Sequence, residues 1–237
     1  MTFAHSVAST RVSRQRPLNR GLILDAALSL INDEGPGALS MRRLGSRLGV
    51  EGMAIYHHFA SRDELLSAIG DRLLEPLQGV ELSDDWREAC RRFATALRDI
   101  VVAQPATFQL LGLLPFETPS SLEPVERLLS VLVERGFSPA AALAIYRATV
   151  SYARGYALAE ATGFTVDAAR PGARRRLAAL RRSEFPILAG RAQELAELDA
   201  DAAYEFGLQA LLSGFPDAGA VKWAGRRDGR SRTRKRR

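Results

Sequence analysis

The sequence predicts an all-α protein with a small N-terminal helical domain and a larger C-terminal one. Apolar residues recur at helical spacing along nearly the whole chain, and no stretch alternates with a period of two for long. Ser and Pro residues stand where helices are expected to begin, and Gly residues stand where they are expected to end. With 237 residues, of which 46% are hydrophobic and 25% charged, the chain has the composition of a globular protein.

The first two helices are marked by apolar faces and by their ends. A helix is expected over residues 19–32, where apolar residues fall on one stripe and Gly35 follows. Ser40 is expected to cap the next, short helix, because its hydroxyl can accept a backbone N–H of the first turn. Gly49 ends that helix, since glycine readily adopts the left-handed backbone of a tight turn.

Two more helices complete the N-terminal group. A second short helix is expected over residues 52–59. Ser61 and Glu64 have the spacing of a capping box for a helix over residues 62–74. Pro76 then ends or kinks this helix, because proline lacks the backbone N–H that the helix requires.

The C-terminal part continues the helical pattern. Helices are expected at residues 86–101, 105–113, 122–132, 139–163, 186–198 and 201–214. The segment Pro115–Ser121 is expected to be a loop, and Leu122 to begin the apolar stripe after it. Ser138 is the expected cap of the longest helix, with Pro139 in its first position. The arginine-rich residues 165–183 have no clear pattern.

These elements define the domain organisation that the sequence predicts. Residues 1–16 form a flexible arm, 17–78 the N-terminal domain, 79–216 the C-terminal domain and 217–237 a basic disordered tail. The tail carries most of the positive charge: residues 222–237 hold nine basic side chains and one acid, so a formal net charge of +6 leaves the rest of the chain slightly acidic.

Several classes of protein are disfavoured. The single cysteine, Cys90, cannot form an internal disulfide and suits a reducing cytoplasm. No apolar run approaches the roughly 20 residues of a membrane span, and no signal peptide opens the chain. We therefore expect a cytoplasmic protein that does not bind a membrane.

The order of the N-terminal helices predicts a helix-turn-helix. The second and third helices are separated only by a turn that contains Gly49, as this motif requires. Ile55 and Phe59 are four residues apart and are expected to face the core. Residues 56–58, Tyr-His-His, then point outward, where tyrosine and histidine side chains can donate hydrogen bonds to phosphate.

Here the residues resemble a known family. The stretch ALSMRRLGSRLGVEGMAIYHHFASRDELLSAI, preceded by an amphipathic helix, resembles the DNA-binding domain of TetR-family transcriptional repressors. The segment AAYEFGLQALLSGF resembles the last helix of regulators close to the tetracycline repressor. The resemblance implies a ligand-responsive repressor that binds a palindromic operator as a homodimer and is released by a small molecule.

The resemblance also implies which residues contact DNA. These are Ser40, Arg42, Gly52, Met53, Ala54, Tyr56, His57, His58 and Arg62. Arg42 is expected to reach a base edge, with guanine as the favoured base. Residues 52–54 face the bases, whereas residues 56–58 and Arg62 contact the sugar-phosphate backbone.

The helix expected over residues 52–59 has few side chains that can read bases. Gly52 and Ala54 have no hydrogen-bonding side chain, so Arg42, methyl contacts from Met53 or Ala54, and DNA shape are expected to carry more of the specificity. A metal site at residues 57–58 is not expected. Adjacent helical residues point about 100° apart, and no cysteine or second histidine cluster is present to complete a site.

The two long C-terminal helices are the predicted dimer interface, because aromatic and small residues on one face allow helices to approach closely. The predicted interface residues are Tyr146, Val150, Arg154, Gly155, Leu158, Tyr204, Gly207, Ala210, Leu211 and Gly214. Burial of the same stripes inside one chain is the open alternative.

The other C-terminal helices are expected to hold the effector. The predicted pocket residues are Phe93, Leu97, Phe108, Leu111, Phe116, Leu129, Val133, Thr149 and Tyr152. In the tetracycline repressors that this segment resembles, the drug is bound through a magnesium ion held partly by histidine. All three histidines, at positions 5, 57 and 58, lie outside this domain, so an apolar or aromatic effector without a metal or other cofactor is expected.

Two other classes of function stay open. The chain could be an enzyme, or a helical protein that has lost DNA binding and serves as an interaction module. No glycine-rich phosphate loop, nucleophile elbow or metal-ligand spacing supports an enzyme. The interaction module rests only on the basic tail.

Overall fold

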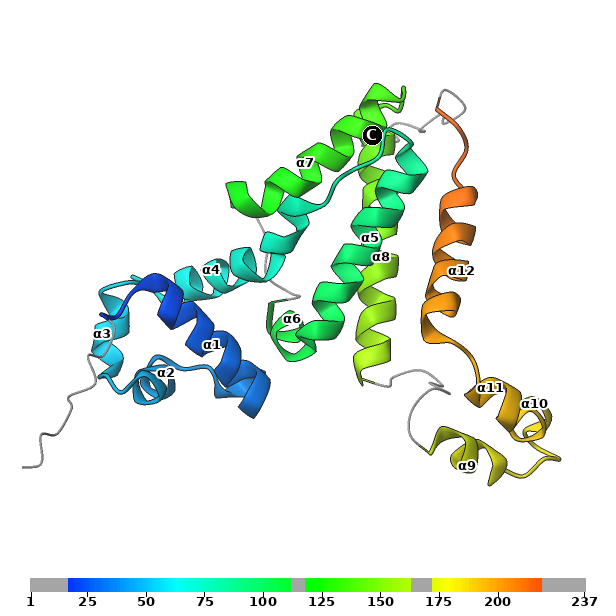
Figure 1. Cartoon of the computed structure of the whole chain (residues 1–237), viewed down its shortest axis with the longest axis horizontal. Coiled ribbons are helices and arrows are strands. Elements are labelled where there is room, and N and C mark those ends of the chain that lie inside the picture. The colour runs from blue at the N-terminus through cyan, green and yellow to red at the C-terminus, as the bar shows by residue number, and fades with distance from the viewer. Residues whose placement is uncertain (1–16, 112–117, 163–171, 219–237) are drawn as a thin grey trace, which may run out of the picture. The chain divides into compact units, whose positions relative to one another are not determined.

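The computed structural model describes residues 17–111, 118–162 and 172–218, and every regular element in these ranges is a helix (Figure 1). The predicted all-α fold is therefore confirmed. The predicted arm, nearly all of the predicted tail and the helix end expected at Gly163 lie outside the described residues. Contacts divide the chain into two compact units, the first ending at Leu65 and the second beginning at Leu66.

The first unit contains the predicted helix-turn-helix. Its helices are α1 (Arg20–Glu34), α2 (Met41–Leu48) and α3 (Gly52–Tyr56), and α4 (Arg62–Leu74) begins in it. A short 3₁₀ turn, η1 (Pro36–Ala38), joins α1 to α2. The large apolar side chains that are fully buried in this unit are Ile23, Leu30, Ile31, Leu44, Ile55, Phe59 and Leu65.

The predicted caps of these helices form. The Ser40 hydroxyl accepts the Arg43 N–H at 3.3 Å, and Gly49 ends α2 in the left-handed region, with φ +68°. Helix α3 is shorter than expected and ends at Tyr56 rather than at residue 59. The N–H groups of His58 and Phe59 both bond to the Ile55 carbonyl, at 2.9 and 3.0 Å, which closes the helix in a turn.

The second unit continues from α4 through the 3₁₀ turn η2 and eight further helices within the described residues. Their bounds are η2 (Glu75–Gly79), α5 (Trp86–Ala103), α6 (Pro105–Leu111), α7 (Pro119–Glu134), α8 (Pro139–Thr162), α9 (Ala173–Ala178), α10 (Pro186–Gly190), α11 (Ala192–Ala196) and α12 (Ala200–Ser213).

Helices α5, α8 and α12 lie side by side (Figure 1). The Trp86 ring meets the Phe137 ring edge-on at 5.1 Å near the start of α8, while Arg98 reaches Glu160 near its end, so α5 and α8 run in the same direction. Helix α12 runs the opposite way, because Asp201 at its start pairs with Arg98 at 2.7 Å.

Helix α7 begins earlier than predicted. Residues Pro119–Ser121, expected in a loop, form its first turn, because Thr118 and Ser121 make a reciprocal capping box with two 3.1 Å hydrogen bonds. The buried face includes Ser121, Pro124, Leu128 and Leu132. Leu122 lies about 100° around the helix from Ser121 and is 47% exposed, so the predicted inward position of Leu122 is wrong.

The helix predicted over residues 186–198 is instead two short helices, α10 and α11. Arg191 separates them with φ −119° and ψ 23°, outside the helical region. Gly190 lies beneath the side chain of Arg182, where a Cβ atom would be 3.2 Å from Nε. Helices α9, α10 and α11 pack against one another.

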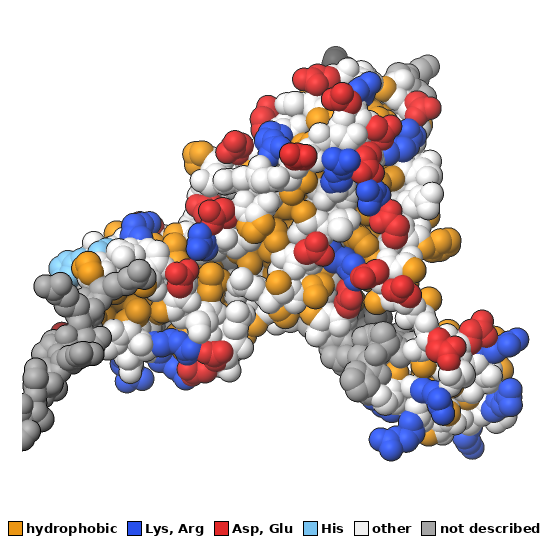
Figure 2. All heavy atoms as spheres, in the orientation of Figure 1, with side chains coloured by type: hydrophobic (Ala, Val, Ile, Leu, Met, Phe, Trp, Pro, Cys, Tyr) orange, Lys and Arg blue, Asp and Glu red, His pale blue; other side chains and the backbone are white. Residues whose placement is uncertain are grey.

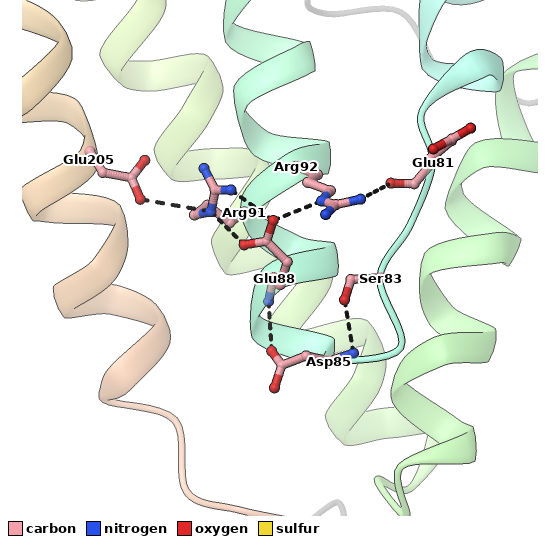
Figure 3. A network of polar contacts seen from close by, with 7 residues as sticks. All are labelled: Glu81, Ser83, Asp85, Glu88, Arg91, Arg92 and Glu205. Carbon is pink, nitrogen blue, oxygen red and sulfur yellow. Dashed lines mark hydrogen bonds and ion pairs between the residues drawn. The ribbon is translucent and has the colours of Figure 1, made fainter.

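A polar network joins the start of α5 to α12 (Figure 3). Arg91 lies between Glu88, at 2.7 Å, and Glu205, at 4.0 Å. Arg92 pairs with Glu88 at 2.7 Å and donates to the Glu81 carbonyl at 3.2 Å. Hydrogen bonds from Arg91 and Arg92 lower the pKa of Glu88 to about 2. Glu88 therefore holds both arginines as a carboxylate at neutral pH.

The start of α12 is fixed by a nearly buried arginine. Arg98 is 8% exposed and binds Glu160 through two hydrogen bonds of 2.9 and 3.1 Å. Its guanidinium also lies 4.6 Å from the centre of the Tyr204 ring. Because its polar partners come from α8 and α12, Arg98 ties both helices to α5.

Candidate nucleic-acid interface

Two glycines bring α2 and α3 into close contact. A Cβ atom on Gly45 would lie 2.8 Å from the Gly52 nitrogen and 2.9 Å from the Val50 oxygen. A Cβ atom on Gly52 would lie 3.3 Å from the Cα atom of Arg42. Gly52 was predicted to face the bases, but in the structure its α-carbon faces the backbone of α2. Gly45, which sequence reasoning missed, is the tighter of the two contacts.

Helix α3 buries one side and exposes the other. Ile55 and Phe59 are fully buried, whereas Met53 is 66% exposed and Tyr56 44% exposed. His57 is exposed, and Ala54 and His58 are half-buried. Figure 2 shows histidine side chains on the surface of the first unit. The side chains of residues 53 and 56–58 thus have access to a ligand outside the unit.

The three arginines of α2 have different surroundings. Arg43 pairs with Glu34, and Arg47 pairs with Asp33 and donates to the Ser29 hydroxyl, all on α1. Arg42 is exposed and has no acidic partner within the described residues. Of the three, Arg42 is therefore the side chain whose charge is available to an external anion.

The remaining predicted contacts lie at helix starts. Ser40 is half-buried, and its hydroxyl already serves as the cap of α2. Arg62, the first residue of α4, is exposed and has no ion pair within the described part of the chain.

Arg20, the first residue of α1, was not among the predicted contacts. Its guanidinium pairs with Glu64 at 2.8 Å, donates to the His58 carbonyl oxygen and lies 4.0 Å from the centre of the Phe59 ring. One hint was present in the sequence, because Arg20 is the last of four arginines, with Arg11, Arg14 and Arg16, that lead into the first helix. Its partner on α4 follows only from the fold.

The predicted effector residues differ in how deeply they are buried. Phe93, Leu97, Phe108 and Thr149 are buried, and Leu129 and Tyr152 are half-buried. Val133 is 42% exposed, which argues against a place in a closed pocket. Phe116 and the side chain of Leu111 lie outside the described residues.

Two buried hydroxyl groups stand out among these residues. Thr107 and Thr149 are completely buried, and neither hydroxyl has a hydrogen-bond partner of ordinary geometry in the described residues. The Thr149 hydroxyl lies beside the Cys90 thiol, a weak partner, and burial raises the pKa of Cys90 to about 12. Buried polar groups of this kind normally find a partner, such as water or a ligand.

Several predicted interface residues lie inside the chain. Tyr204 is 2% exposed and packs between Tyr152 and Tyr156, with ring centres 5.4 and 5.2 Å away. A Cβ atom on Gly207 would lie 2.2 Å from the Tyr152 hydroxyl, which donates to the Tyr204 carbonyl at 2.8 Å. Tyr204 and Gly207 thus join α12 to α8, as the intramolecular alternative anticipated.

The other predicted interface residues lie at or near the surface. Gly155, Ala210 and Gly214 are exposed, and Tyr146, Val150, Arg154, Leu158 and Leu211 are half-buried. Tyr146 also meets the predicted pocket residue Phe93 edge-on at 6.1 Å, and the Arg154 guanidinium lies 5.1 Å from the centre of the Phe108 ring. Phe206 is the most exposed large apolar side chain of the described residues, at 77%.

Neither a metal-binding cluster nor a membrane-spanning helix is found among the described residues. No group of three or more His, Cys, Asp or Glu side chains there is arranged to hold a metal ion. No helix in the same ranges is long and apolar enough to cross a membrane.

Comparison with protein families divides the chain as the fold does. Residues 23–69 match the family of bacterial regulatory proteins named after TetR, and residues 78–218 match the tetracycline repressor-like C-terminal domain. The second match alone spans more than half of the chain.

Individual proteins agree with this result. A helix-turn-helix transcriptional regulator from Saccharopolyspora erythraea is 31% identical over 183 residues, 75% of this chain and 77% of that protein. A possible TetR-family regulator from Streptomyces coelicolor superposes with a TM-score of 0.69 at 28% identity, covering 83% of this chain and 98% of that one.

The Streptomyces coelicolor TetR-family protein ActR, solved in complex with actinorhodin, has a TM-score of 0.66 and 26% identity over 84% of this chain and 97% of its own. These matches cover both the helix-turn-helix and the helices of the second unit. The chain belongs to the TetR family and is a helix-turn-helix transcriptional regulator.

Proposed function

We propose that the protein is a repressor that binds a palindromic operator as a homodimer and leaves it when a small apolar or aromatic effector binds. The observation that carries this proposal is the two-sided character of α3. Ile55 of α3 and Phe59 just after it are buried, while Met53 and residues 56–58 are accessible on the outer side.

The accessible residues suit different parts of a DNA duplex. Arg42 has the length and the fork of donors to bind a guanine edge in the major groove. Met53 offers an apolar contact to a thymine methyl group. Tyr56, His58 and Arg62 carry donors suited to phosphate oxygens, which fix the register of the protein without reading sequence.

Gly52 has a different role in this proposal from the one that the sequence predicted. Its α-carbon lies against α2, so it allows the two helices of the motif to pack closely rather than reading a base. Specificity then rests on fewer side chains, and DNA shape is expected to contribute at positions that the protein does not touch.

Binding a palindrome requires two copies held at a fixed spacing. Helix-turn-helix dimers bind half-sites about 34–36 Å apart, or a multiple of this distance. The exposed faces of α8 and α12 are the surfaces that we assign to this contact. Effector binding would favour a dimer in which the two α3 helices are wrongly spaced for the half-sites. Operator affinity then falls by the factor by which the effector binds this state more tightly than the DNA-binding state.

The nature of the effector is inferred from the interior of the second unit. Its buried side chains around α5, α6 and α8 are mostly apolar, and Phe93 and Phe108 are aromatic. Thr107 and Thr149 supply a small number of buried hydroxyl groups that still lack a strong partner. An aromatic compound with one or two polar substituents fits this combination.

A binding experiment tests the proposal. We expect the protein to select a palindrome from a pool of random duplexes, and Tyr56→Phe combined with His58→Ala to weaken binding to all sequences alike, because only phosphate contacts are lost. Tyr156→Phe, which removes a tyrosine hydroxyl from the second unit at a residue outside the predicted pocket and interface, is the matched control. Unchanged affinity in the double variant would show that this face does not meet DNA.

A further inference from the structure

The segment after α3 is held by side chains rather than by helical hydrogen bonds. Helix α3 has only five residues, too few to be stable alone, and residues 57–61 that follow it are not helical. The direction in which α3 presents Tyr56 and His58 therefore depends on what fixes residues 57–61.

Arg20 contacts this segment at three points. It donates to the His58 carbonyl, its guanidinium covers one face of the buried Phe59 ring at 4.0 Å, and it pairs with Glu64 at 2.8 Å. Arginine presents several donors in one plane, so a single side chain can hold a carbonyl, a ring and a carboxylate together.

Glu64 completes the arrangement from the other side. One carboxylate oxygen accepts the Arg20 guanidinium, and the other accepts the backbone N–H of Ala60 at 2.7 Å. Glu64 was predicted to cap α4 together with Ser61, whose hydroxyl does accept the Glu64 N–H at 3.0 Å. Its carboxylate instead reaches one residue further back, into the segment that follows α3.

These contacts fall between Tyr56 and Arg62, two of the predicted phosphate-binding residues. Arg20 and Glu64 come from α1 and α4, and between them they hold the backbone at residues 58 and 60. An isolated exposed ion pair contributes little to stability. A pair that also fixes two backbone groups and a ring restricts the geometry of the segment, which matters more for binding than for folding.

We propose that Arg20 and Glu64 form a clamp that orients the end of α3, so that Tyr56 and His58 meet the phosphates of the operator. Both are positioning residues in this proposal, which rests on the proposed DNA-binding face. Neither side chain needs to contact DNA itself.

The clamp makes a prediction opposite in sign to that of electrostatics alone. Glu64 is a negative charge near a surface that binds a polyanion, so its neutralisation should strengthen DNA binding if charge were all that mattered. If Glu64 positions α3 through Arg20, its neutralisation should weaken binding. The sign of the change therefore distinguishes the two roles.

The experiment compares Glu64→Gln with Asp63→Asn in the full-length protein, by fluorescence anisotropy on the selected operator. Asp63 is exposed in the same first turn of α4 and makes no contact with Arg20. We expect Glu64→Gln to weaken binding about fivefold, and Asp63→Asn to bind equally well or more tightly. Thermal melts of each variant test whether it is folded at the assay temperature.

Arg20→Gln and the double variant provide the second readout. If Arg20 acts through Glu64, the double variant should bind about as weakly as either single variant. The dependence of log K on log salt should keep its slope, whereas loss of a phosphate contact would reduce the slope by about 0.9.

The clamp is overturned if Glu64→Gln behaves like Asp63→Asn, or if the losses add and Arg20→Gln reduces the salt slope. The Tyr56→Phe and His58→Ala variant separates these failures from failure of the DNA-binding face. If the Arg20 and Glu64 variants bind normally while the Tyr56→Phe and His58→Ala variant binds weakly, the clamp is refuted and the DNA-binding face is not.

Discussion

At the scale of single residues, surroundings decide which of several similar side chains is available for binding. The sequence RRLGSR in α2 offers three arginines, and composition does not distinguish them. The structure does, because Glu34 and Asp33 at the end of α1 neutralise Arg43 and Arg47 and leave Arg42 without an acidic partner in the described residues.

This difference leads to a prediction for Arg42. Arg42→Ala should weaken binding to the best operator about tenfold or more, since a bidentate contact to guanine is worth about 1–3 kcal/mol. It should also relax the preference at one base position of each half-site. Selection from a duplex library that is randomised at single positions measures both effects.

Arg43→Ala is the matched control on the same helix. Its exposed ion pair with Glu34 contributes at most about 1 kcal/mol to stability, so the free energy of unfolding should change little and base preference should not change. Equal loss of preference in the two variants would contradict the assignment of Arg42 as the base-reading arginine.

The same residues show what the sequence could predict. Ser40 and Gly49 were predicted because their roles depend on local geometry, a cap and a left-handed turn, and both form. The Arg20–Glu64 contact joins residues 44 positions apart, and nothing local in the sequence pairs them. The close approach at Gly45 was missed for a different reason: its neighbours Val50 and Gly52 lie only a few residues on, but the turn at Gly49 brings them back against α2.

At the scale of helices, sequence patterns located elements better than they oriented them. Helices α1, α5, α8 and α12 begin within a few residues of the predicted positions, because each has a cap and a long apolar stripe. The stripe of α7 was assigned to the wrong side at Leu122, since leucines occupy several of its faces. The break between α10 and α11 was missed because Gly190 and Arg191 interrupt no stripe.

The network at the start of α5 gives a prediction for pH dependence. The folded protein lowers the pKa of Glu88 from 4.5 to about 2, so the carboxylate form favours the folded state. This stabilisation is complete above about pH 4.5, and it is lost as the pH falls toward 2. Glu88→Gln should therefore lower the melting temperature at neutral pH, with a difference from wild type that shrinks below pH 4.5.

Glu123→Gln is a suitable control for this effect. Glu123 is an exposed acid in the first turns of α7, and no polar partner of its side chain is found among the described residues. Its replacement should leave the melting temperature nearly unchanged at every pH. A constant difference between Glu88→Gln and wild type from pH 7 to pH 2 would mean that charge on Glu88 is not the source of the stabilisation.

At the scale of the whole molecule, the sequence predicted an N-terminal and a C-terminal part. It did not separate the residues of the last helix that pack inside the chain from those available to a second subunit. Aromatic and small residues of α12 were all assigned to the dimer contact, because a helical stripe does not reveal what it packs against. Tyr204 and Gly207 face α8 of the same chain. Phe206, which lies between them in the sequence, is 77% exposed and is directed away from this contact.

The exposed faces of the two helices are therefore the better candidates for dimerisation. On α8, exposed residues recur every four positions at Leu143, Arg147, Ser151 and Gly155. On α12 the exposed residues include Ala202, Phe206, Gln209, Ala210 and Ser213. Leu143 and Phe206 are the large apolar side chains of these faces, and the small residues Ser151, Gly155, Ala202, Ala210 and Ser213 beside them suit close helix packing around two apolar anchors.

Phe206→Glu tests this assignment. Burying one phenylalanine is worth about 1.5–3 kcal/mol, and a symmetric dimer buries two, so the dimer should dissociate at least about a hundredfold more readily. Operator affinity should fall with it, since each monomer reads only one half-site. Leu198→Glu, at an apolar residue that is 56% exposed outside both faces, should change neither property. Analytical ultracentrifugation gives the dissociation constants, and a Phe206→Glu protein with the same dissociation constant as wild type would place the subunit contact elsewhere.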